Sequence, residues 1–328
     1  MTVSGSSALC FGKLPSHADF IRFNAASREV LAFDEWLHHG LYFARTQIGQ
    51  GWEQAFARSP QYYFLFYPEN AERFLAGVMQ ASQDKSQRKY PFLVSMLMDR
   101  RWFPDSQVYL APIVFSEFFE RARQIVDRAI GGLEMREIAD QTQALNVPVL
   151  DHGTTESRYR EEYLDALSVK DFWQRLFGSF EDPRKYLLFK NLTEVLLPLR
   201  HRSLSRMNLG LRFPLSKGGG TTAFEVCFWL HVSLALLDAS PGTPFLFWNL
   251  PHNDAAGYLF LFFRQPSARN FLQLIRPEAD NDTICAMDEE GKEKLATVAQ
   301  TLSYSHRALL EAGDEKLSHF LHGLKKAV

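Results

Sequence analysis

The stretch Gly77–Asp99, GVMQASQDKSQRKYPFLVSMLMD, decides how the first part of the chain is interpreted. An apolar run at Phe74–Gln80 leads into it, and a second apolar run, Phe92–Met98, completes it. Two short apolar runs separated by a polar crossing are typical of neighbouring β-strands. Because the crossing carries Asp84 and Arg88, it either holds a turn together or presents a recognition surface.

The elements around this loop predict an α+β domain. Strands in immediate succession indicate antiparallel pairing, with helices packed on a face of the sheet. The pattern differs from the strict alternation of strand and helix in a doubly wound sheet. We predict strands at Ala8–Lys13, Tyr62–Phe66, Phe74–Gln80, Phe92–Met98 and Val108–Val114, a turn at Leu14–Asp19, and helices over Phe33–Ala44, with Ser27 as the cap, and over Phe115–Ala129.

The second half is predicted as a smaller α/β subdomain with a β-hairpin and a helical tail. A chain of 328 residues usually exceeds one core. We therefore divide it into a first domain at 1–132, a polar connector at 133–160 and a C-terminal subdomain at 161–328. In the last of these we predict helices at Val169–Phe180, Arg184–Leu197, Thr222–Leu237 and Ala268–Ile275, a strand at Leu209–Leu215, a hairpin of Pro244–Trp248 with Tyr258–Phe263, and a helical tail from Lys292.

Composition excludes several classes of function. The formal net charge of −2 gives no sign of the excess positive charge with which proteins bind nucleic acid or an anionic membrane. The three cysteines are far apart and odd in number, which favours a reducing compartment. The N-terminal residues lack the pattern of a signal peptide, and no apolar run reaches the roughly 20 residues of a membrane span. The sequence therefore predicts a cytoplasmic protein that neither enters a membrane nor binds nucleic acid.

The glycine-rich run Ser216–Thr222, SKGGGTT, is a candidate phosphate site, because it lies between a predicted strand and a predicted helix. Its lysine precedes the glycines, so it departs from the G-x-x-x-x-G-K-[ST] pattern. A flexible connector followed by a capping box of Thr222 with Glu225 explains the run without a ligand. A nucleotide-binding or enzymatic protein that uses residues 216–222 is the alternative function.

Other patterns give little support for catalysis. Cys227 and His231 share a helix face at a spacing that allows metal binding, but their apolar neighbours indicate a buried thiol and a core histidine. No G-x-S-x-G elbow occurs, and Ser16, His17 and Asp19 are too close in sequence to form a triad. We therefore expect no enzymatic activity, no cofactor and no metal.

Two polar turns beside strands remain, Lys13–Phe20 and Asp84–Pro91. In a structural interpretation, Asp84 and Arg88 satisfy each other and the turn amides, while proline fixes each bend. In a functional interpretation, the turns form a recognition surface on a rigid sheet. The two roles can coexist.

These turns resemble a known family. Phe11–Arg22, FGKLPSHADFIR, resembles the opening F-G-K-L-P-x-x-G-D-F of the TagF/ImpM family of type VI secretion-associated proteins. Asp34–Leu41, DEWLHHGL, resembles its D-x-W-L-x-x-G-L helix. The loop Gly77–Pro91 fits the pattern G-V-x-x-x-S-x-D-x-x-x-R-x-Y-P. Ala18 and Gln87 stand where the family usually has glycine, so a bend that needs a positive φ is expected to change there.

The second half resembles the family more weakly, at Phe247–Trp248 and Gln265–Ile275. The resemblance implies a longin-like antiparallel sheet with packed helices for residues 1–132. It also implies a non-enzymatic cytoplasmic regulator, typically a post-translational repressor, of a bacterial type VI secretion system. The expected partners are components of that system, including a forkhead-associated scaffold protein, and the oligomeric state stays open. Some members carry a PP2C-type phosphatase, but its acidic D-G and G-D-G metal motifs do not occur here.

The residues carried over as motif or interaction candidates are Lys13, Pro15, His17, Asp19, Phe20, Asp34, Trp36, Asp84, Arg88, Tyr90 and Pro91.

Overall fold

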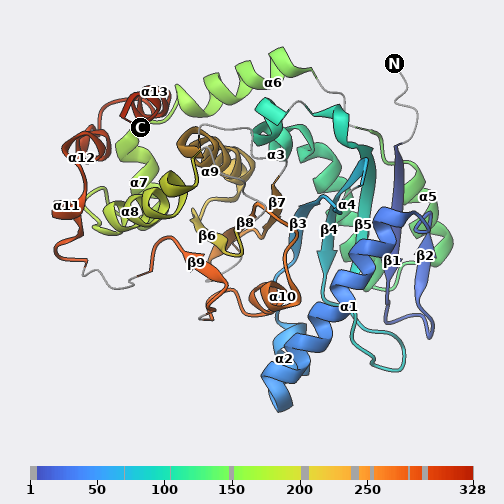
Figure 1. Cartoon of the computed structure of the whole chain (residues 1–328). Coiled ribbons are helices and arrows are strands. Elements are labelled where there is room, and N and C mark those ends of the chain that lie inside the picture. The colour runs from blue at the N-terminus through green and yellow to red at the C-terminus, as the bar shows by residue number, and fades with distance from the viewer. Residues whose placement is uncertain are drawn as a thin grey trace.

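A single mixed sheet runs through the part of the chain that the structure describes (Figure 1). The structure is a computed structural model and describes residues 6–69, 71–103, 105–147, 151–200, 207–237, 244–251, 255–279, 281–289 and 295–327. The strand order is β2-β1-β5-β4-β3-β7-β8-β6-β9, and every neighbouring pair is antiparallel except β6 with β9. The strands are β1 Ser7–Gly12, β2 Ile21–Phe23, β3 Tyr62–Phe66, β4 Arg73–Gln80, β5 Phe92–Asp99, β6 Gly210–Leu215, β7 Phe245–Trp248, β8 Gly257–Phe262 and β9 Ile284–Ala286.

Helices cover both faces of the first strands, as β3 shows. Tyr63 contacts Phe119 of α4, with ring centroids 5.6 Å apart, whereas Phe64 contacts Phe33 of α1 at 4.8 Å. Successive strand residues point to opposite faces, so α1 and α4 lie on opposite sides of the sheet. The expected α+β fold with an antiparallel-dominated sheet is confirmed. The helices here are α1 Arg28–Ile48, α2 Trp52–Ala57, α3 Ala111–Val114, α4 Ser116–Ile130 and α5 Met135–Gln143.

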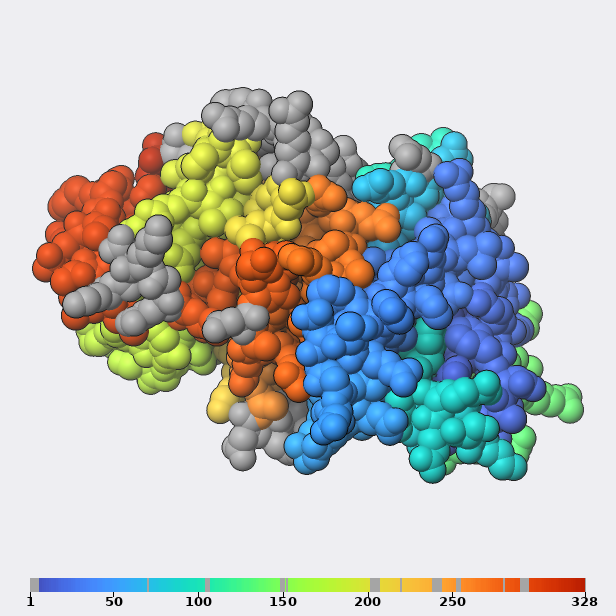
Figure 2. Space-filling model, turned by 60° about the horizontal axis from the view of Figure 1, so that its bottom comes forward, coloured from blue at the N-terminus to red at the C-terminus, as the bar shows by residue number. Residues whose placement is uncertain are grey.

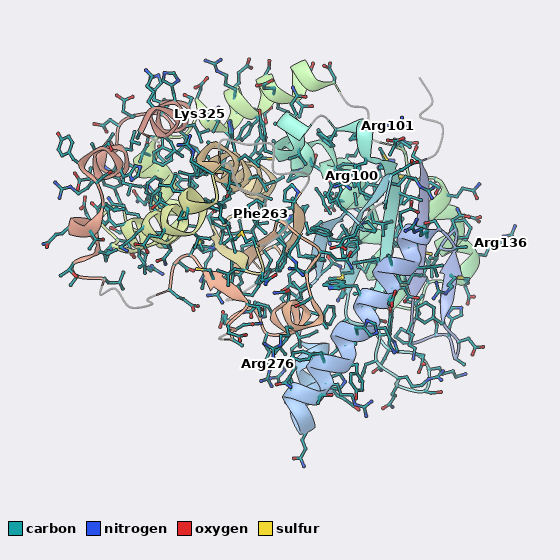
Figure 3. The ribbon with its side chains drawn as sticks, viewed as in Figure 1. Arg100, Arg101, Arg136, Phe263, Arg276 and Lys325 are labelled. Carbon is teal, nitrogen blue, oxygen red and sulfur yellow. The ribbon has the colours of Figure 1, made fainter. Side chains whose placement is uncertain are left out.

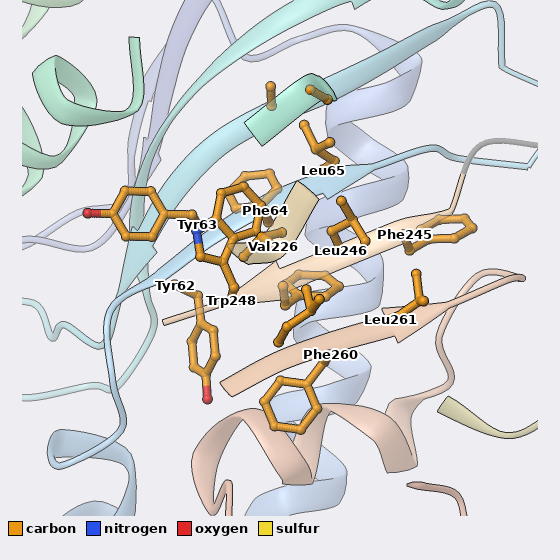
Figure 4. Packing of buried hydrophobic residues seen from close by; sticks show 14 of the residues in the cluster. Tyr62, Tyr63, Phe64, Leu65, Val226, Phe245, Leu246, Trp248, Phe260 and Leu261 are labelled. Carbon is orange, nitrogen blue, oxygen red and sulfur yellow. The ribbon is translucent and has the colours of Figure 1, made fainter. Parts of the chain in front are cut away.

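Aromatic side chains fill the middle of the sheet, where β3, β7 and β8 lie side by side (Figure 4). Trp248 stacks on Tyr63 with centroids 5.6 Å apart. On the other face, Phe247 stacks on Trp36 of α1 at 5.2 Å. Rings of this size bury large apolar areas, so β7 continues the core of the first strands into the second half of the chain.

The remaining helices follow α5 in the chain. The helix at Ala268–Ile275 packs along α1, and the others gather beyond β6, around α9 (Figure 1). Helix α9 is buried on nearly every side, as its apolar sequence predicts, and contacts α3, α8 and α13. The helices of this part are α6 His152–Tyr159, followed by a single wider turn at Arg160–Leu164, then α7 Val169–Phe177, α8 Arg184–Leu196, α9 Thr222–Leu237, α10 Ala268–Ile275, α11 Val298–Thr301, α12 Tyr304–Glu311 and α13 Leu317–Ala327.

Several expected elements are confirmed. The hairpin of β7 and β8 forms with Phe245 opposite Phe262, although residues 252–254 of its loop lie outside the described residues. The helix at Ala268–Ile275 has the bounds expected from the sequence. The tail forms three separate helices, α11 to α13, from Val298 onward, whereas its expected start at Lys292 lies outside the described residues.

Other expectations are wrong in detail. The strand expected at Val108–Val114 is helical, because Pro112 fits the first turn of α3 and cannot donate a hydrogen bond within a sheet. Helix α7 ends at Phe177 rather than Phe180, because Gly178 adopts a left-handed conformation, with φ of 87°, that closes the helix. The short strands β2 and β9 were not expected from the sequence.

Residues 133–160, expected to be a connector, contain α5 and α6. Helix α5 packs on β1, with Ile138 fully buried, while Arg136 lies at the periphery of the molecule (Figure 3). The pairing of β3 with β7 carries the sheet from the first half of the chain into the second. The expected domain boundaries stay a prediction.

Candidate functional site

The crossing between β4 and β5 is a hydrogen-bonded loop. The last strand pair joins Gln80 to Phe92, and a further isolated pair joins Gln83 to Lys89. Inside that pair, the amide of Asp84 donates to the carbonyl of Arg88 at 3.1 Å. The backbone of the loop is therefore partly hydrogen-bonded to itself.

The carboxylate of Asp84 ties this loop together from inside. Its Oδ1 accepts hydrogen bonds from the amides of Ser86 and Arg88, each at 2.9 Å. Its Oδ2 accepts from the Arg88 Nε at 2.6 Å and faces the Lys13 Nζ at 3.0 Å. Burial alone would raise the pKa of Asp84, but these donors outweigh burial and hold that pKa well below its usual range.

The same arrangement fastens the second turn, Lys13–Phe20, to the loop. The Lys85 amide donates to the carbonyl of His17, and Arg88 Nη2 donates to the carbonyl of Ala18, both at 2.8 Å. Pro15 and Asp19 are exposed on this turn, and the half-buried ring of His17 lies 2.9 Å from the Ser16 hydroxyl. The two turns thus form one continuous surface.

Asp34 on α1 holds the other side of this surface. Tyr90 donates its hydroxyl proton to Asp34 Oδ1, and Arg22 Nη2 donates to Oδ2, both at 2.5 Å. The ring of Phe20 meets that of Tyr90 edge-on, with centroids 5.0 Å apart. Burial, followed by the nearby Asp34 carboxylate, raises the pKa of Tyr90 well above its usual range. Tyr90 therefore serves as a hydrogen-bond donor, not as an acid.

Trp36 and Pro91 are placed by packing. Trp36 is 5% exposed and contacts Phe66, Phe247 and Phe271 at ring-centroid distances of 5.2 to 5.5 Å. The Pro91 carbonyl lies where a Cβ on Gly12 would come within 2.1 Å of it, so β1 and β5 approach closely there. Both residues support the site from the core and do not present a surface.

The two departures from family glycines have different consequences. Gln87 has a φ of 65°, in the left-handed region, so the bend is kept despite the side chain. Ala18 has no positive φ, so no glycine is required at its position. The expected change of the loop is therefore absent at Gln87, where the backbone retains a conformation that favours glycine.

An open groove of about 840 Å³ runs between α1 and the loop (Figure 2). In that view α1 is blue and the loop is teal. Seven predicted residues contribute to it or lie directly behind it, since Lys13, Phe20, Asp34, Arg88 and Tyr90 line it, Asp84 holds Lys13, and Trp36 supports α1. The structure thus gathers two turns and a helix that are separate in the sequence.

Sequence reasoning missed the helical wall of this groove. That wall consists of side chains on one face of α1 and the start of α2, and its most exposed large hydrophobic side chains are Tyr42, 72% exposed, and Leu31, 51% exposed. An apolar residue on the outer face of an amphipathic helix was the available signal, but apolar residues also occur singly on ordinary surfaces. The residues on this wall are Leu31, Asp34, Glu35, His38, Leu41, Tyr42, Arg45, Trp52 and Glu53.

The glycine-rich run 216–222 lies away from this groove, at the start of α9. Ser216 donates its amide to both oxygens of Glu225, at 3.0 and 3.1 Å, and its hydroxyl donates to Oε2 at 2.5 Å. A buried carboxylate at this helix start opposes the binding of an anion. Burial raises the pKa of Glu225 to about 7, against the opposing effect of the Ser216 hydrogen bonds.

Cys227 and His231 both lie in the core. The Cys227 thiol is fully buried, and His231 stacks on Tyr109 with ring centroids 4.4 Å apart. Among the described residues, no group of three or more His, Cys, Asp or Glu side chains is placed to hold a metal ion. Within the same ranges, none of the helices combines the length and the apolar character needed to cross a membrane.

Comparisons with known proteins place the groove in context. Residues 9–145 match the model of the TagF N-terminal domain, described as type VI secretion system-associated. No curated protein matches the chain. The crystal structure of PA0076 from Pseudomonas aeruginosa PAO1, at 2.05 Å resolution, aligns at 21% identity with a TM-score of 0.36. That alignment covers 44% of this chain and 64% of the other, so the chain spans less than two thirds of that protein.

The matched range contains both turns, the Asp84 carboxylate and the whole of α1. Residues 9–145 of the chain are therefore similar to the TagF N-terminal domain, which is described as type VI secretion system-associated.

Proposed function

We propose that this protein is a non-enzymatic accessory regulator of a bacterial type VI secretion system, and that it acts as a post-translational repressor. It works in the cytoplasm by binding a component of the apparatus, such as a forkhead-associated scaffold protein. The observation that carries the proposal is the groove, which gathers the family motifs at one open surface of about 840 Å³.

The chemistry of the groove favours binding over catalysis. Asp84 accepts hydrogen bonds from the Ser86 and Arg88 amides and from the Arg88 guanidinium, and it forms an ion pair with Lys13. Its depressed pKa removes it as a general base near neutral pH. The Asp34 carboxylate likewise accepts hydrogen bonds from the Tyr90 hydroxyl and the Arg22 guanidinium. Charges that neutralise one another in this way shape a surface, and the Asp84 and Asp34 carboxylates are engaged in holding it together.

The alternative, a nucleotide site at 216–222, gains no support from the geometry. The Ser216 amide, which a phosphate would need, is bonded to Glu225. The carboxylate also places negative charge where a phosphate would approach. A thermal-shift panel with nucleotides tests this alternative directly, because a nucleotide-dependent rise in melting temperature would reveal a site.

The proposal is tested by recovery of secretion components with tagged protein as bait, in the bacterium that makes it. Arg88→Ala removes the side-chain bonds to the Asp84 carboxylate and to the Ala18 carbonyl, and Tyr42→Ala removes an exposed ring from the opposite wall. We expect both variants to recover less partner and to release secretion from repression. Tyr304→Ala removes an 82% exposed ring from α12 and serves as the matched control.

Melting curves of the purified variants separate loss of partner from loss of fold. If the wild-type bait recovers no secretion component and deletion of the gene leaves secretion unchanged, the proposal fails. A measurable reaction that disappears with Arg88 would instead establish an enzyme.

A further inference from the structure

The outer face of α1 carries an exposed stripe. Leu31, Glu35, His38, Tyr42 and Arg45 follow one another at intervals of three or four residues, so they share one helix face. All five are exposed and line the groove. Two of them, Leu31 and Tyr42, are among the few large hydrophobic side chains that stand exposed within the described part of the chain. Such a stripe is a candidate interaction surface.

The charges of the stripe are separated along the helix. Glu35 lies toward the N-terminal end and Arg45 toward the C-terminal end, ten residues and therefore roughly 15 Å apart. Within the described ranges, neither side chain makes a hydrogen bond or an ion pair. Their neighbour Asp34, in contrast, is bonded to Tyr90 and Arg22. The stripe thus offers one free acid and one free base to a second surface.

The arrangement is symmetric about the level of Gly40. Glu35 and Arg45 lie five residues to either side, and His38 and Tyr42 lie two residues to either side. A second α1 laid antiparallel across a two-fold axis at this level therefore sets Glu35 against Arg45 and His38 against Tyr42. In a two-fold interface each such contact occurs twice.

We propose that this stripe is a homodimer interface, occupied by a second copy of this chain with the two α1 helices antiparallel. Glu35 then pairs with Arg45 of the second copy, and Tyr42 packs against His38 of that copy. This goes beyond the proposed function, since it requires no secretion component. Because the stripe is also one wall of the groove, self-association covers the groove and competes with any partner that binds there.

Sedimentation velocity of the purified full chain tests the proposal across a range of protein and salt concentrations. We expect a monomer–dimer equilibrium that weakens as salt rises, since exposed ion pairs are screened. Glu35→Arg or Arg45→Glu should each weaken the dimer by about tenfold, because each reversal places like charges together at two symmetric sites. The double variant E35R/R45E restores the pairs with opposite polarity and should restore the dimer.

Tyr304→Ala is the control, because it removes an exposed ring from α12 without touching α1. Circular dichroism and melting curves show whether the reversals leave the fold unchanged. A wild-type chain that stays monomeric at low salt and concentrations on the order of 100 µM overturns the proposal. The proposal is also overturned if the single charge reversals leave the dimer dissociation constant unchanged, or if the double variant does not restore the dimer. The purified chain contains no secretion component, so this result is independent of the partner test.

Discussion

Asp84 shows at the scale of one residue how a motif becomes a surface. Its carboxylate joins Lys13 on the first turn to the loop that contains Arg88, and Arg88 reaches back to the Ala18 carbonyl. The bonds to backbone amides fix the loop, while the bonds to cations fix the two turns against each other. The structural and the functional interpretation of this pair are therefore compatible, since a rigid clasp places the neighbouring exposed groups.

Gln87 supplies a prediction about stability. Its φ of 65° costs about 1–2 kcal/mol for a residue with a Cβ, whereas glycine loses roughly 0.5–1 kcal/mol in chain entropy. We expect Gln87→Gly to raise the free energy of unfolding by about 0.5–1 kcal/mol, as measured by denaturant titration. Gln87→Val should lower it by at least about 1 kcal/mol, because a β-branched residue fits this conformation poorly.

Ser86→Gly is the matched control in the same loop. Ser86 is exposed and has no positive φ, so glycine there brings only the entropic loss. If Gln87→Gly destabilises the protein as much as Ser86→Gly does, the left-handed conformation at Gln87 is not present in solution.

At the scale of elements, α9 carries two buried titratable groups with opposite effects on stability. Burial raises the pKa of Glu225 from 4.5 to about 7, so its contribution to stability is present below pH 4.5 and is lost as pH rises through 7. Burial, followed by the nearby Lys325, lowers the pKa of His231 from 6.5 to about 4. Its contribution is present above pH 6.5 and is lost as pH falls through 4.

Each group makes the free energy of unfolding depend on pH, with a slope of opposite sign. We expect these two slopes largely to cancel in the wild type between pH 4.5 and 6.5. In Glu225→Gln only the pH dependence due to His231 remains, so the free energy of unfolding should rise with pH between pH 4.5 and 6.5. His231→Phe keeps a ring against Tyr109. In this variant only the pH dependence due to Glu225 remains, so the free energy of unfolding should fall as pH rises in the same window. Denaturant titrations at several pH values measure both slopes, each of which amounts to about 3 kcal/mol over the whole titration. Parallel pH profiles for the two variants would contradict this account.

The sequence predicts elements well where one pattern dominates. The strands on either side of the Asp84 loop follow from apolar runs, and the hairpin of β7 and β8 follows from two more. The apolar residues of α3 give no period over so few positions, so they do not distinguish a helix from a strand, and only Pro112 indicates the helix. The strand β9 has only three residues and pairs in parallel with a distant partner, which no local pattern reveals.

The candidate site was predictable only in part, for a related reason. Asp84 and Arg88 lie four residues apart, so their pairing was open to sequence reasoning. The groove depends on α1 and the loop meeting across the fold, which only the tertiary structure provides. Leu31 and Tyr42 are exposed, but leucine and tyrosine also occur in the core of this protein. The sequence alone therefore does not show which of these side chains lie on the surface.

At the scale of the whole molecule, the matched domain depends on the second half of the chain. Helix α1 packs along α10, and Trp36 lies against Phe247 and Phe271 from that half. The two helices approach closely at Gly40, where an added Cβ would lie 2.5 Å from both Cβ and Cγ of Phe271. Because the Cβ of Phe271 is tied to its backbone, the clash cannot be relieved by rotating the ring.

Gly40→Ala should therefore force the two helices apart and lower the free energy of unfolding by about 1–3 kcal/mol. If the two halves share one core, calorimetry will show a single transition at a lower temperature, with no early unfolding of residues 9–145 alone. Gly153→Ala on α6 is the control, because an added Cβ there meets only the Asp151 carboxylate at 3.7 Å. That change should be neutral or slightly stabilising, as for an exposed helix position. Two separate transitions in the wild type, or a Gly40→Ala variant as stable as the control, would show that the halves fold independently.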